Sequence, residues 1–167
     1  MERMTGQVKY RILFVCLGNI CRSPAAEAVM QHIVAAEGRA SEFFVDSAGT
    51  YAGHRGELAD PRMRSAASRR GYTLLSRSRP VCSDDFDRFD MIVAMDDSNY
   101  ERLYRLAPSV EASRKIFRMV EFCRTHPEAS YVPDPYYEGA EGFEIVLDLL
   151  EDACRGLFDR VVAGKKG

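Results

Sequence analysis

A cysteine and an arginine stand at the two ends of residues 16–22, a short segment that combines a nucleophile with an anion-binding side chain. An apolar run, residues 12–15, precedes Cys16, and a helical pattern begins near Pro24, after Arg22. A loop between a strand and a helix turns its backbone N–H groups inward, and the helix N-terminus adds partial positive charge. Such a loop binds a dianion, favours a thiolate over a thiol and lets an arginine hold two phosphate oxygens. The segment therefore predicts phosphoryl transfer through a cysteinyl-phosphate.

The residues inside this loop are suited to binding phosphate. Gly18 and Asn19 both tolerate the positive φ that a tight anion-binding loop requires. Ser23 and Pro24, directly after the arginine, provide an entry to the helix. The ATPase-type loop G-x-x-x-x-G-K-[ST] is absent from the sequence. Besides Cys16 and Arg22, the predicted phosphate-binding residues are Leu17, Gly18, Asn19, Ile20, Cys21 and Ser23.

Residues 15–24 resemble the signature V-C-x-G-N-I-C-R-S-P of the low-molecular-weight protein tyrosine phosphatases, and match it at every fixed position. A second block of that family, D-P-Y-Y, stands at residues 134–137, and smaller blocks match at residues 46–50, 60–62 and 95–99. The resemblance runs from about residue 10 to the last helix. It implies hydrolysis of phosphotyrosine in proteins, and of small aryl phosphates, without a metal or other cofactor.

Asp134 is the predicted general acid and base. A phenolate-like leaving group needs a proton in the transition state, and a carboxylic acid can supply it. Pro133 and Pro135 stiffen the backbone on both sides of this aspartate. After the first step the ionised Asp134 would activate water, while Ser23 would donate its hydroxyl to the departing sulfur of Cys16.

The resemblance also implies partners for the loop. Asn19 is expected to be held in a strained conformation by hydrogen bonds, with Ser47 as one partner. A further family partner, a histidine near residue 70, is missing, and a serine in residues 72–79 stands about where it would fall. Cys21 is either an inert packing residue or a disulfide partner for oxidised Cys16.

The walls of the substrate pocket are a further expectation. Tyr136 and Tyr137 would form one wall, on which a phenyl ring packs. The opposite wall would follow Thr50, where relatives often carry tryptophan. This chain has no tryptophan, and Gly53 falls at that position, so Tyr51 is the expected substitute.

Apolar runs and helical patterns alternate along the chain. Strands are expected at residues 10–15, 43–45, 91–94 and 115–119. One helix should end at Gly38, a second should run from Asp60 to Gly71, and a third should start at Asp96 or Asp97 and run through residue 104. The last helix places one apolar stripe along its length: Phe143, Val146 or Leu147, Leu150, Cys154, Leu157 and Val161.

This alternation predicts a single-domain, three-layer α/β/α fold with a central four-stranded parallel sheet and the phosphate-binding loop after the first strand. The 167 residues suit one domain, expected at residues 9–163, with frayed tails at residues 1–8 and 164–167. Ligands of such sheets bind beyond the carboxyl ends of the strands, which is where Cys16 lies.

Composition narrows the class of protein. Hydrophobic residues at 46% and charged residues at 29% are ordinary for a globular protein. The net charge of −2 argues against non-specific nucleic-acid binding.

No apolar stretch approaches the ~20 residues of a membrane span, and the N-terminus has no apolar signal-peptide core. Five cysteines without regular spacing argue against a secreted disulfide framework, so we expect a cytoplasmic location. The three histidines, His32, His54 and His126, lack metal-ligand spacing.

Three alternative functions share part of this pattern. A thiol-linked arsenate reductase needs two further cysteines on a mobile segment, and Cys82 has no second cysteine within the next dozen residues. A phosphoarginine phosphatase resembles this family but carries threonine where this loop has Ile20. A non-catalytic phosphotyrosine-binding module would have no use for a general acid such as Asp134.

The expected partners follow from the predicted activity. A tyrosine-phosphorylated protein is the expected substrate, and a tyrosine kinase is a candidate partner. Neither nucleic acid nor a membrane is expected as a partner. The near-neutral charge and the tyrosines leave a monomer and a weak homodimer both open.

Overall fold

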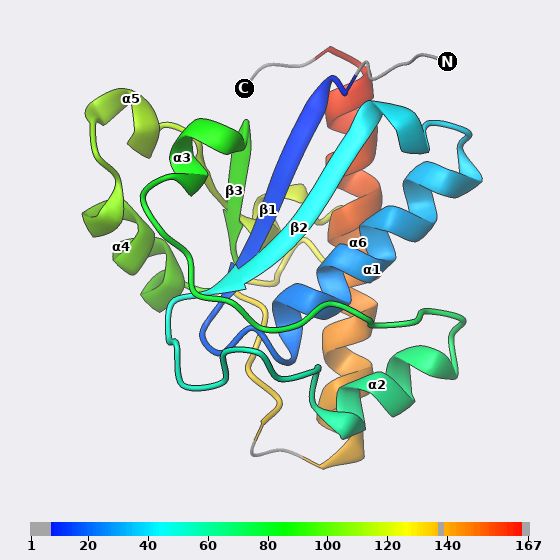
Figure 1. Cartoon of the computed structure of the whole chain (residues 1–167). Helices are drawn as coiled ribbons and strands as arrows, with labels where there is room; N and C mark the ends of the chain where they lie inside the picture. The colour runs from blue at the N-terminus through cyan, green and yellow to red at the C-terminus, as the bar shows by residue number, and fades with distance from the viewer. Residues whose placement is uncertain (1–7, 137–138, 165–167) are drawn as a thin grey trace.

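The computed structural model describes residues 8–136 and 139–164, and its centre is a sheet of four parallel strands (Figure 1). In spatial order the strands are β2 (Phe43–Gly49), β1 (Tyr10–Cys16), β3 (Met91–Ala94) and β4 (Ile116–Arg118). Helices cover both faces of this sheet, which confirms the predicted three-layer α/β fold. The tails predicted at residues 1–8 and 164–167 lie outside the described residues, except for Val8 and Gly164.

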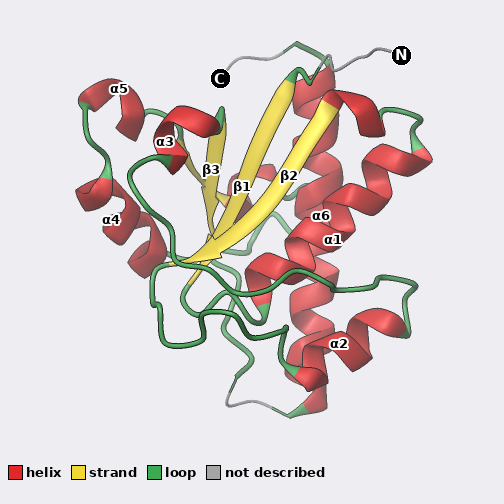
Figure 2. Cartoon of the chain, viewed as in Figure 1, coloured by secondary structure: helices red, strands yellow, loops and turns green. Residues whose placement is uncertain are grey.

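The helices divide between the two faces (Figure 2). On one side of the sheet are α1 (Arg22–Ala36), α2 (Pro61–Ser68) and α6 (Ala140–Val162). On the other side are α3 (Asp85–Arg88), α4 (Asp97–Leu106) and α5 (Val110–Ser113). No helix among the described residues combines the length and the apolar character that crossing a membrane requires.

β1 is buried on both faces because its side chains alternate between two cores. Ile12 and Phe14 belong to the core shared with α1 and α6, and both are fully buried. Leu13 and Val15 belong to the core shared with α3 and α4, and are equally buried. Burial of each such side chain stabilises the fold by about 1.5–3 kcal/mol. The strand is therefore held rigidly at the point where Cys16 ends it.

The helix ends follow local sequence signals. Asp60 caps α2 by accepting a hydrogen bond from the backbone N–H of Arg62, with Pro61 at the first helical position. Of the two aspartates considered for α4, Asp96 is the N-cap, and its side chain accepts from the Asn99 backbone N–H. The apolar stripe of α6 is buried from Phe143 through Leu157, whereas Val161 is only partly buried.

Several element boundaries differ from the sequence predictions. β2 continues to Gly49 because it pairs with β1 along its whole length. β4 is shorter than residues 115–119, since Met119 already belongs to a 3₁₀ turn, η2 (Met119–Phe122). Besides η2, three short elements were not predicted, because they are too short for a periodic pattern: α3, α5 and a 3₁₀ turn, η1 (Ala40–Glu42).

The start of α1 also differs from the prediction. The helix begins at Arg22, and its N-cap is Cys21, which makes no side-chain capping bond. Ser23 is therefore inside the helix, and its hydroxyl points to the loop instead of capping a backbone N–H. Loop residues 17–21 connect the end of β1 directly to this helix N-terminus.

Candidate active site

Cys16 lies at the bottom of the loop, almost completely buried. Its Sγ atom is 3.0 Å from the Ser23 hydroxyl oxygen and 3.4 Å from the Ser23 backbone nitrogen. Both groups belong to the first turn of α1, so the sulfur lies at the positive end of the helix dipole.

The loop backbone offers unused donors. The N–H groups of residues 18–21 donate to no acceptor in the described part of the chain. These residues border the same cavity as Cys16, apart from Asn19, which faces the protein interior. Unpaired N–H groups that surround a nucleophile are suited to binding the oxygens of an anion.

Asn19 is the only non-glycine residue with positive φ among the described residues, at 57°. Its amide nitrogen donates to Ser23 Oγ at 2.8 Å and to Ser47 Oγ at 3.0 Å. Its amide oxygen accepts from the Arg79 backbone N–H at 3.0 Å. Ser47 is thus a partner of Asn19, as expected. Gly18, by contrast, does not adopt positive φ; a side chain there would press against the ring of His54.

The hydrogen bonds that support the loop extend from Ser47 to the carboxyl group of Glu27, a residue of α1. Ser47 Oγ donates to Glu27 Oε1 at 2.6 Å, and Ser76 also bonds this carboxyl group. Burial raises the pKa of Glu27, although these hydrogen bonds act in the opposite direction. The Ser78 hydroxyl donates to the Gly18 carbonyl at 3.0 Å. Residues 76–79 and Glu27 therefore support the loop where the family histidine was expected.

Arg22 is fully buried and tightly oriented. Its Nη1 donates to Asp96 Oδ2 at 2.7 Å and to the Val132 carbonyl at 3.0 Å. Burial alone would lower the pKa of Arg22, but its interactions with the nearby Cys16 and Asp96 side chains raise the pKa above its usual value. The guanidinium is therefore a fixed cation beside the sulfur.

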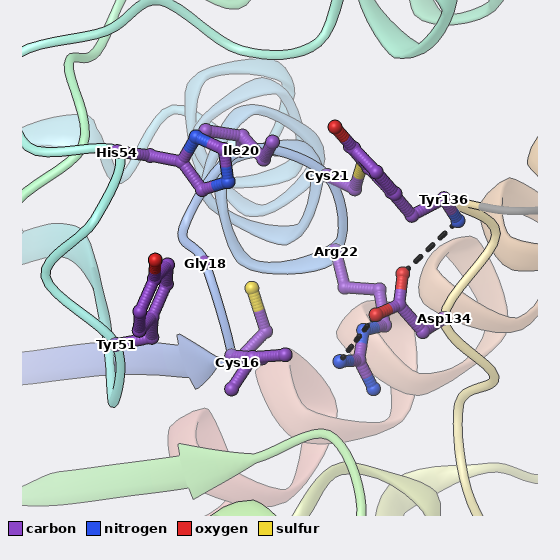
Figure 3. Close-up of a pocket in the computed structure, with 10 residues that line it drawn as sticks. Cys16, Gly18, Ile20, Cys21, Arg22, Tyr51, His54, Asp134 and Tyr136 are labelled. Atoms are coloured by element: carbon purple, nitrogen blue, oxygen red, sulfur yellow. Dashed lines mark hydrogen bonds and ion pairs between the residues drawn. The ribbon is translucent and has the colours of Figure 1, made fainter.

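Asp134 comes from the loop between η2 and α6. It reaches the cavity from the side opposite Tyr51 and His54 (Figure 3). Its Oδ2 is 3.6 Å from Arg22 Nη2, and its Oδ1 accepts from the Tyr136 backbone N–H at 3.0 Å. The side chain is 38% exposed, so it can meet a ligand at the cavity mouth.

The cavity has a volume of about 350 Å³ and is open to solvent. It brings together most of the residues singled out in the sequence. Its lining is Cys16, Leu17, Gly18, Ile20, Cys21, Arg22, Tyr51, His54, Asp134 and Tyr136. Asn19, Ser23 and Ser47 do not line the cavity; Asn19 bonds to both serines, and Ser23 contacts the Cys16 sulfur. Tyr137 lies outside the described residues.

Aromatic rings stand at the cavity mouth (Figure 3). The rings of Tyr51 and His54 meet edge to face at 5.9 Å between centroids, and His54 is 6.4 Å from the Tyr136 ring. His54 Nδ1 lies 3.0 Å from Glu57 Oε1. Tyr51 and Tyr136 lie on opposite sides of the opening (Figure 3), and their role as substrate walls stays a prediction.

Sequence reasoning missed three residues of this site. His54 was considered only as a metal ligand, whereas it lines the cavity. Asp96 was considered only as a helix cap, whereas its second oxygen also orients Arg22. Its position after β3 was an available signal, because parallel strands deliver their following residues to one edge of the sheet. No local sequence pattern indicated that Glu27 supports the loop.

Cys21 also lines the cavity, as a free thiol like Cys16. Burial, reinforced by the nearby Asp60 carboxylate, strongly raises the pKa of Cys21. This environment disfavours the thiolate form of Cys21, the last residue of the loop. No three His, Cys, Asp or Glu side chains of residues 8–136 and 139–164 are grouped to hold a metal ion.

Comparison with known proteins gives a consistent result. Residues 11–166 match the family model described as low molecular weight phosphotyrosine protein phosphatase. A low molecular weight protein-tyrosine-phosphatase of Streptomyces coelicolor is 41% identical over 157 residues, covering 91% of this chain and 93% of that protein. A crystal structure of a protein tyrosine phosphatase from Entamoeba histolytica gives a TM-score of 0.92 at 49% identity, covering 95% and 100% of the two chains. A drosophila arginine phosphatase gives a TM-score of 0.82 at 30% identity, covering 90% and 96%.

The parallel sheet and the cysteine loop at its carboxyl edge define an α/β enzyme with an anion site. The chain belongs to the low molecular weight phosphotyrosine protein phosphatases. It is accordingly a hydrolase of the protein-phosphatase class, and phosphorylated proteins are its substrates.

Proposed function

We propose that the protein hydrolyses phosphotyrosine through a cysteinyl-phosphate, with Cys16 as nucleophile, Arg22 as phosphate clamp and Asp134 as general acid and base. The supporting observation is the loop itself. The unpaired N–H groups of residues 18–21 belong to the loop that borders the cavity, and the buried Arg22 and Cys16 line the same cavity. A dianion satisfies all three at once.

The first step forms a bond between Cys16 sulfur and phosphorus as the bond to the tyrosine oxygen breaks. Asp134 gives its proton to that oxygen, so the leaving group departs as neutral tyrosine. Arg22 and the loop N–H groups hold the equatorial oxygens, which carry charge in the transition state. Because Asp96 and Val132 fix the guanidinium, Arg22 is oriented before the substrate arrives.

The second step releases phosphate. Asp134, now ionised, takes a proton from water as the water oxygen bonds to phosphorus, and the bond to sulfur breaks. Ser23 Oγ accepts from Asn19, and its own hydrogen has two acceptors within reach, the Cys16 sulfur at 3.0 Å and the Ala48 carbonyl at 3.4 Å; in this step it turns to the sulfur. That donor stabilises the departing thiolate.

The aromatic walls favour tyrosine as the phosphorylated residue. Cys16 lies at the bottom of the cavity, and Tyr51 and Tyr136 stand at its mouth. A phosphoserine side chain is too short for the depth at which Cys16 lies. A phosphotyrosine side chain is longer, and its phenyl ring reaches between the Tyr51 and Tyr136 rings and packs on them. Arg62 stacks over the Tyr136 ring at 5.3 Å, which supports that wall from behind.

The alternatives are less well supported. An arsenate reductase would need cysteines that reach Cys16, but neither Cys82 nor Cys123 lines the cavity. Phosphoarginine hydrolysis is favoured by the similarity to the drosophila arginine phosphatase. However, Ile20 presents an apolar, β-branched side chain to the cavity, and this suits an aryl ester better than a guanidinium. A binding module would not need Asp134 beside Arg22.

The experiment is steady-state hydrolysis of a phosphotyrosine peptide, with a chelator present, for the wild type, Cys16→Ser and Cys82→Ser. We expect turnover in the wild type and in Cys82→Ser, whose exposed thiol lies outside the cavity. Cys16→Ser should lose turnover, because a serine hydroxyl stays protonated at neutral pH.

Three results would contradict the proposal. Peptide binding without turnover in the wild type would indicate a binding module. Faster hydrolysis of phosphoarginine than of phosphotyrosine would assign the arginine activity. Turnover that survives in Cys16→Ser would remove Cys16 as the nucleophile. The tyrosine kinase partner, the oligomeric state and the cytoplasmic location remain predictions.

A further inference from the structure

The loop between β2 and α2 carries Tyr51 and two glycines whose roles differ. Gly56 has a φ of +86°, and a side chain there would meet open space. Gly56 is thus required by the backbone, since only glycine adopts this conformation without strain. Gly53 does not have positive φ, so its backbone would accept any residue.

At Gly53 the absence of a side chain instead makes room for the Tyr51 ring. A Cβ atom at residue 53 would overlap the Tyr51 ring at its Cε2, Cζ and hydroxyl atoms. The ring therefore lies directly on the α-carbon of Gly53, in the space that any other residue would fill. Even alanine would displace it, because the overlap involves the first atom of the side chain.

This contact matters because Tyr51 is otherwise weakly held. Its side chain is 54% exposed, although its backbone N–H donates to the Leu17 carbonyl at 2.8 Å. Among the described residues, the one aromatic ring that it meets is that of His54, edge to face. An exposed tyrosine without packing on its flat face samples several rotamers. Packing on Gly53 fixes one of them, and in that rotamer the ring borders the cavity (Figure 3).

We infer that Gly53 is the positioning residue for Tyr51, and that the missing side chain at residue 53 determines the preference for aryl over alkyl phosphates. Gly53 itself does not border the cavity, so it acts through the tyrosine ring alone. This inference rests on the proposed function, in which Tyr51 forms one wall of the substrate site.

The inference predicts a specific kinetic pattern. In Gly53→Ala the Tyr51 ring leaves the wall, and KM for phenyl phosphate should rise about fivefold, the worth of one aromatic contact. Neither kcat nor inhibition by inorganic phosphate should change, because Cys16, Arg22 and the loop N–H groups are untouched. KM for ethyl phosphate should also stay constant.

A double-mutant cycle separates this role from general damage to the loop. Tyr51→Ala should show the same rise in KM, and the variant with both changes should show no further rise. Gly56→Ala is the matched control, since it strains the same loop without touching the ring. It should lower the melting temperature but leave the ratio of the two KM values unchanged.

Binding measurements keep the test independent of turnover. The ratio of phenylphosphonate to methylphosphonate affinity, measured by calorimetry, should fall about fivefold in Gly53→Ala. If the affinity ratio falls about fivefold from wild type to Gly53→Ala but the wild type shows no hydrolysis, the proposed function fails and the role of Gly53 stands. The inference is overturned if Gly53→Ala keeps the wild-type ratio, if Gly56→Ala changes it equally, or if the effects of Gly53→Ala and Tyr51→Ala add. Gly53→Ser, which adds the same Cβ, replaces Gly53→Ala if the alanine variant does not fold.

Discussion

Asn19 makes three hydrogen bonds through its side-chain amide, and these hold one strained backbone conformation. A positive φ costs a non-glycine residue on the order of 1 kcal/mol. Hydrogen bonds to Ser23 and Ser47 and from the Arg79 backbone offset this cost. The same bonds fix the Ser23 hydroxyl beside Cys16. The Asn19 side chain thus controls both the backbone conformation of the loop and the hydrogen bonding around the Cys16 sulfur.

The role of Asp134 gives a prediction at the residue scale. Asp134→Asn keeps the size of the side chain but cannot donate the proton that a tyrosine leaving group needs. We expect kcat for a phosphotyrosine peptide to fall about 10²–10⁴-fold. The fall should be much smaller for para-nitrophenyl phosphate, whose leaving group needs little protonation. Steady-state kinetics with both substrates measures the difference, and equal losses would argue for a structural role.

Helix α1 connects the catalytic loop to a carboxyl group on its other side. Arg22 and Ser23 lie in the first turn, and Glu27 lies one turn further along. Because residues four apart share one helix face, Glu27 can reach Ser47, the partner of Asn19. The helix therefore supplies an anion-binding end and also the support for the loop.

Glu27 gives a prediction at the scale of this element. Glu27→Leu removes the acceptor for the Ser47 hydroxyl and leaves a buried donor unpaired. We expect the free energy of unfolding to fall by about 1–3 kcal/mol, and inhibition by inorganic phosphate to weaken. Glu27→Gln is the control, because its amide oxygen still accepts this bond. Urea denaturation and phosphate inhibition are the measurements, and a Leu variant that matches wild type in both would refute the support role.

At the scale of the whole molecule, α6 ties the loop after η2 to the core. Asp152 on this helix accepts from the backbone N–H groups of Arg124, Thr125 and His126. Burial alone would raise the pKa of Asp152, but these hydrogen bonds outweigh it and lower the pKa well below its usual range. The loop that carries Asp134 continues from this anchored segment.

The lowered pKa of Asp152 predicts how stability depends on pH. A carboxyl group with a lower pKa in the folded state stabilises the fold above its unfolded pKa of about 3.9. This stabilisation is lost as the pH falls toward the folded value. Asp152→Asn should therefore cost about 1–3 kcal/mol at pH 5.5, and its difference from wild type should shrink at pH 3.

Urea denaturation at the two pH values tests this, with Asp148→Asn on the same helix as control. The Asp148 side chain is largely exposed, so its ion pair with Arg70 contributes little. A cost for Asp152→Asn that is the same at both pH values would contradict the assignment.

The chain's local patterns determined much of this protein. The loop from Cys16 to Arg22, the cap at Asp60 and the apolar stripe of α6 depend on neighbours within a few residues, so the sequence shows them directly. The alternation of strands and helices likewise predicts the parallel sheet and the edge where the site lies. Asp134 and Tyr51 could be selected because family-like blocks surround them.

Only the tertiary structure decided how the site is held together. Arg22 is oriented by Asp96 and Val132, which are 74 and 110 residues away in sequence. Asn19 is completed by the Arg79 backbone, 60 residues away. The Val132 carbonyl and the Arg79 backbone N–H carry no residue-type signal, so these two contacts leave no mark in the sequence. Tyr51 and Gly53 are close in sequence, but their packing cannot be read from the sequence either, because it depends on the three-dimensional path of the loop.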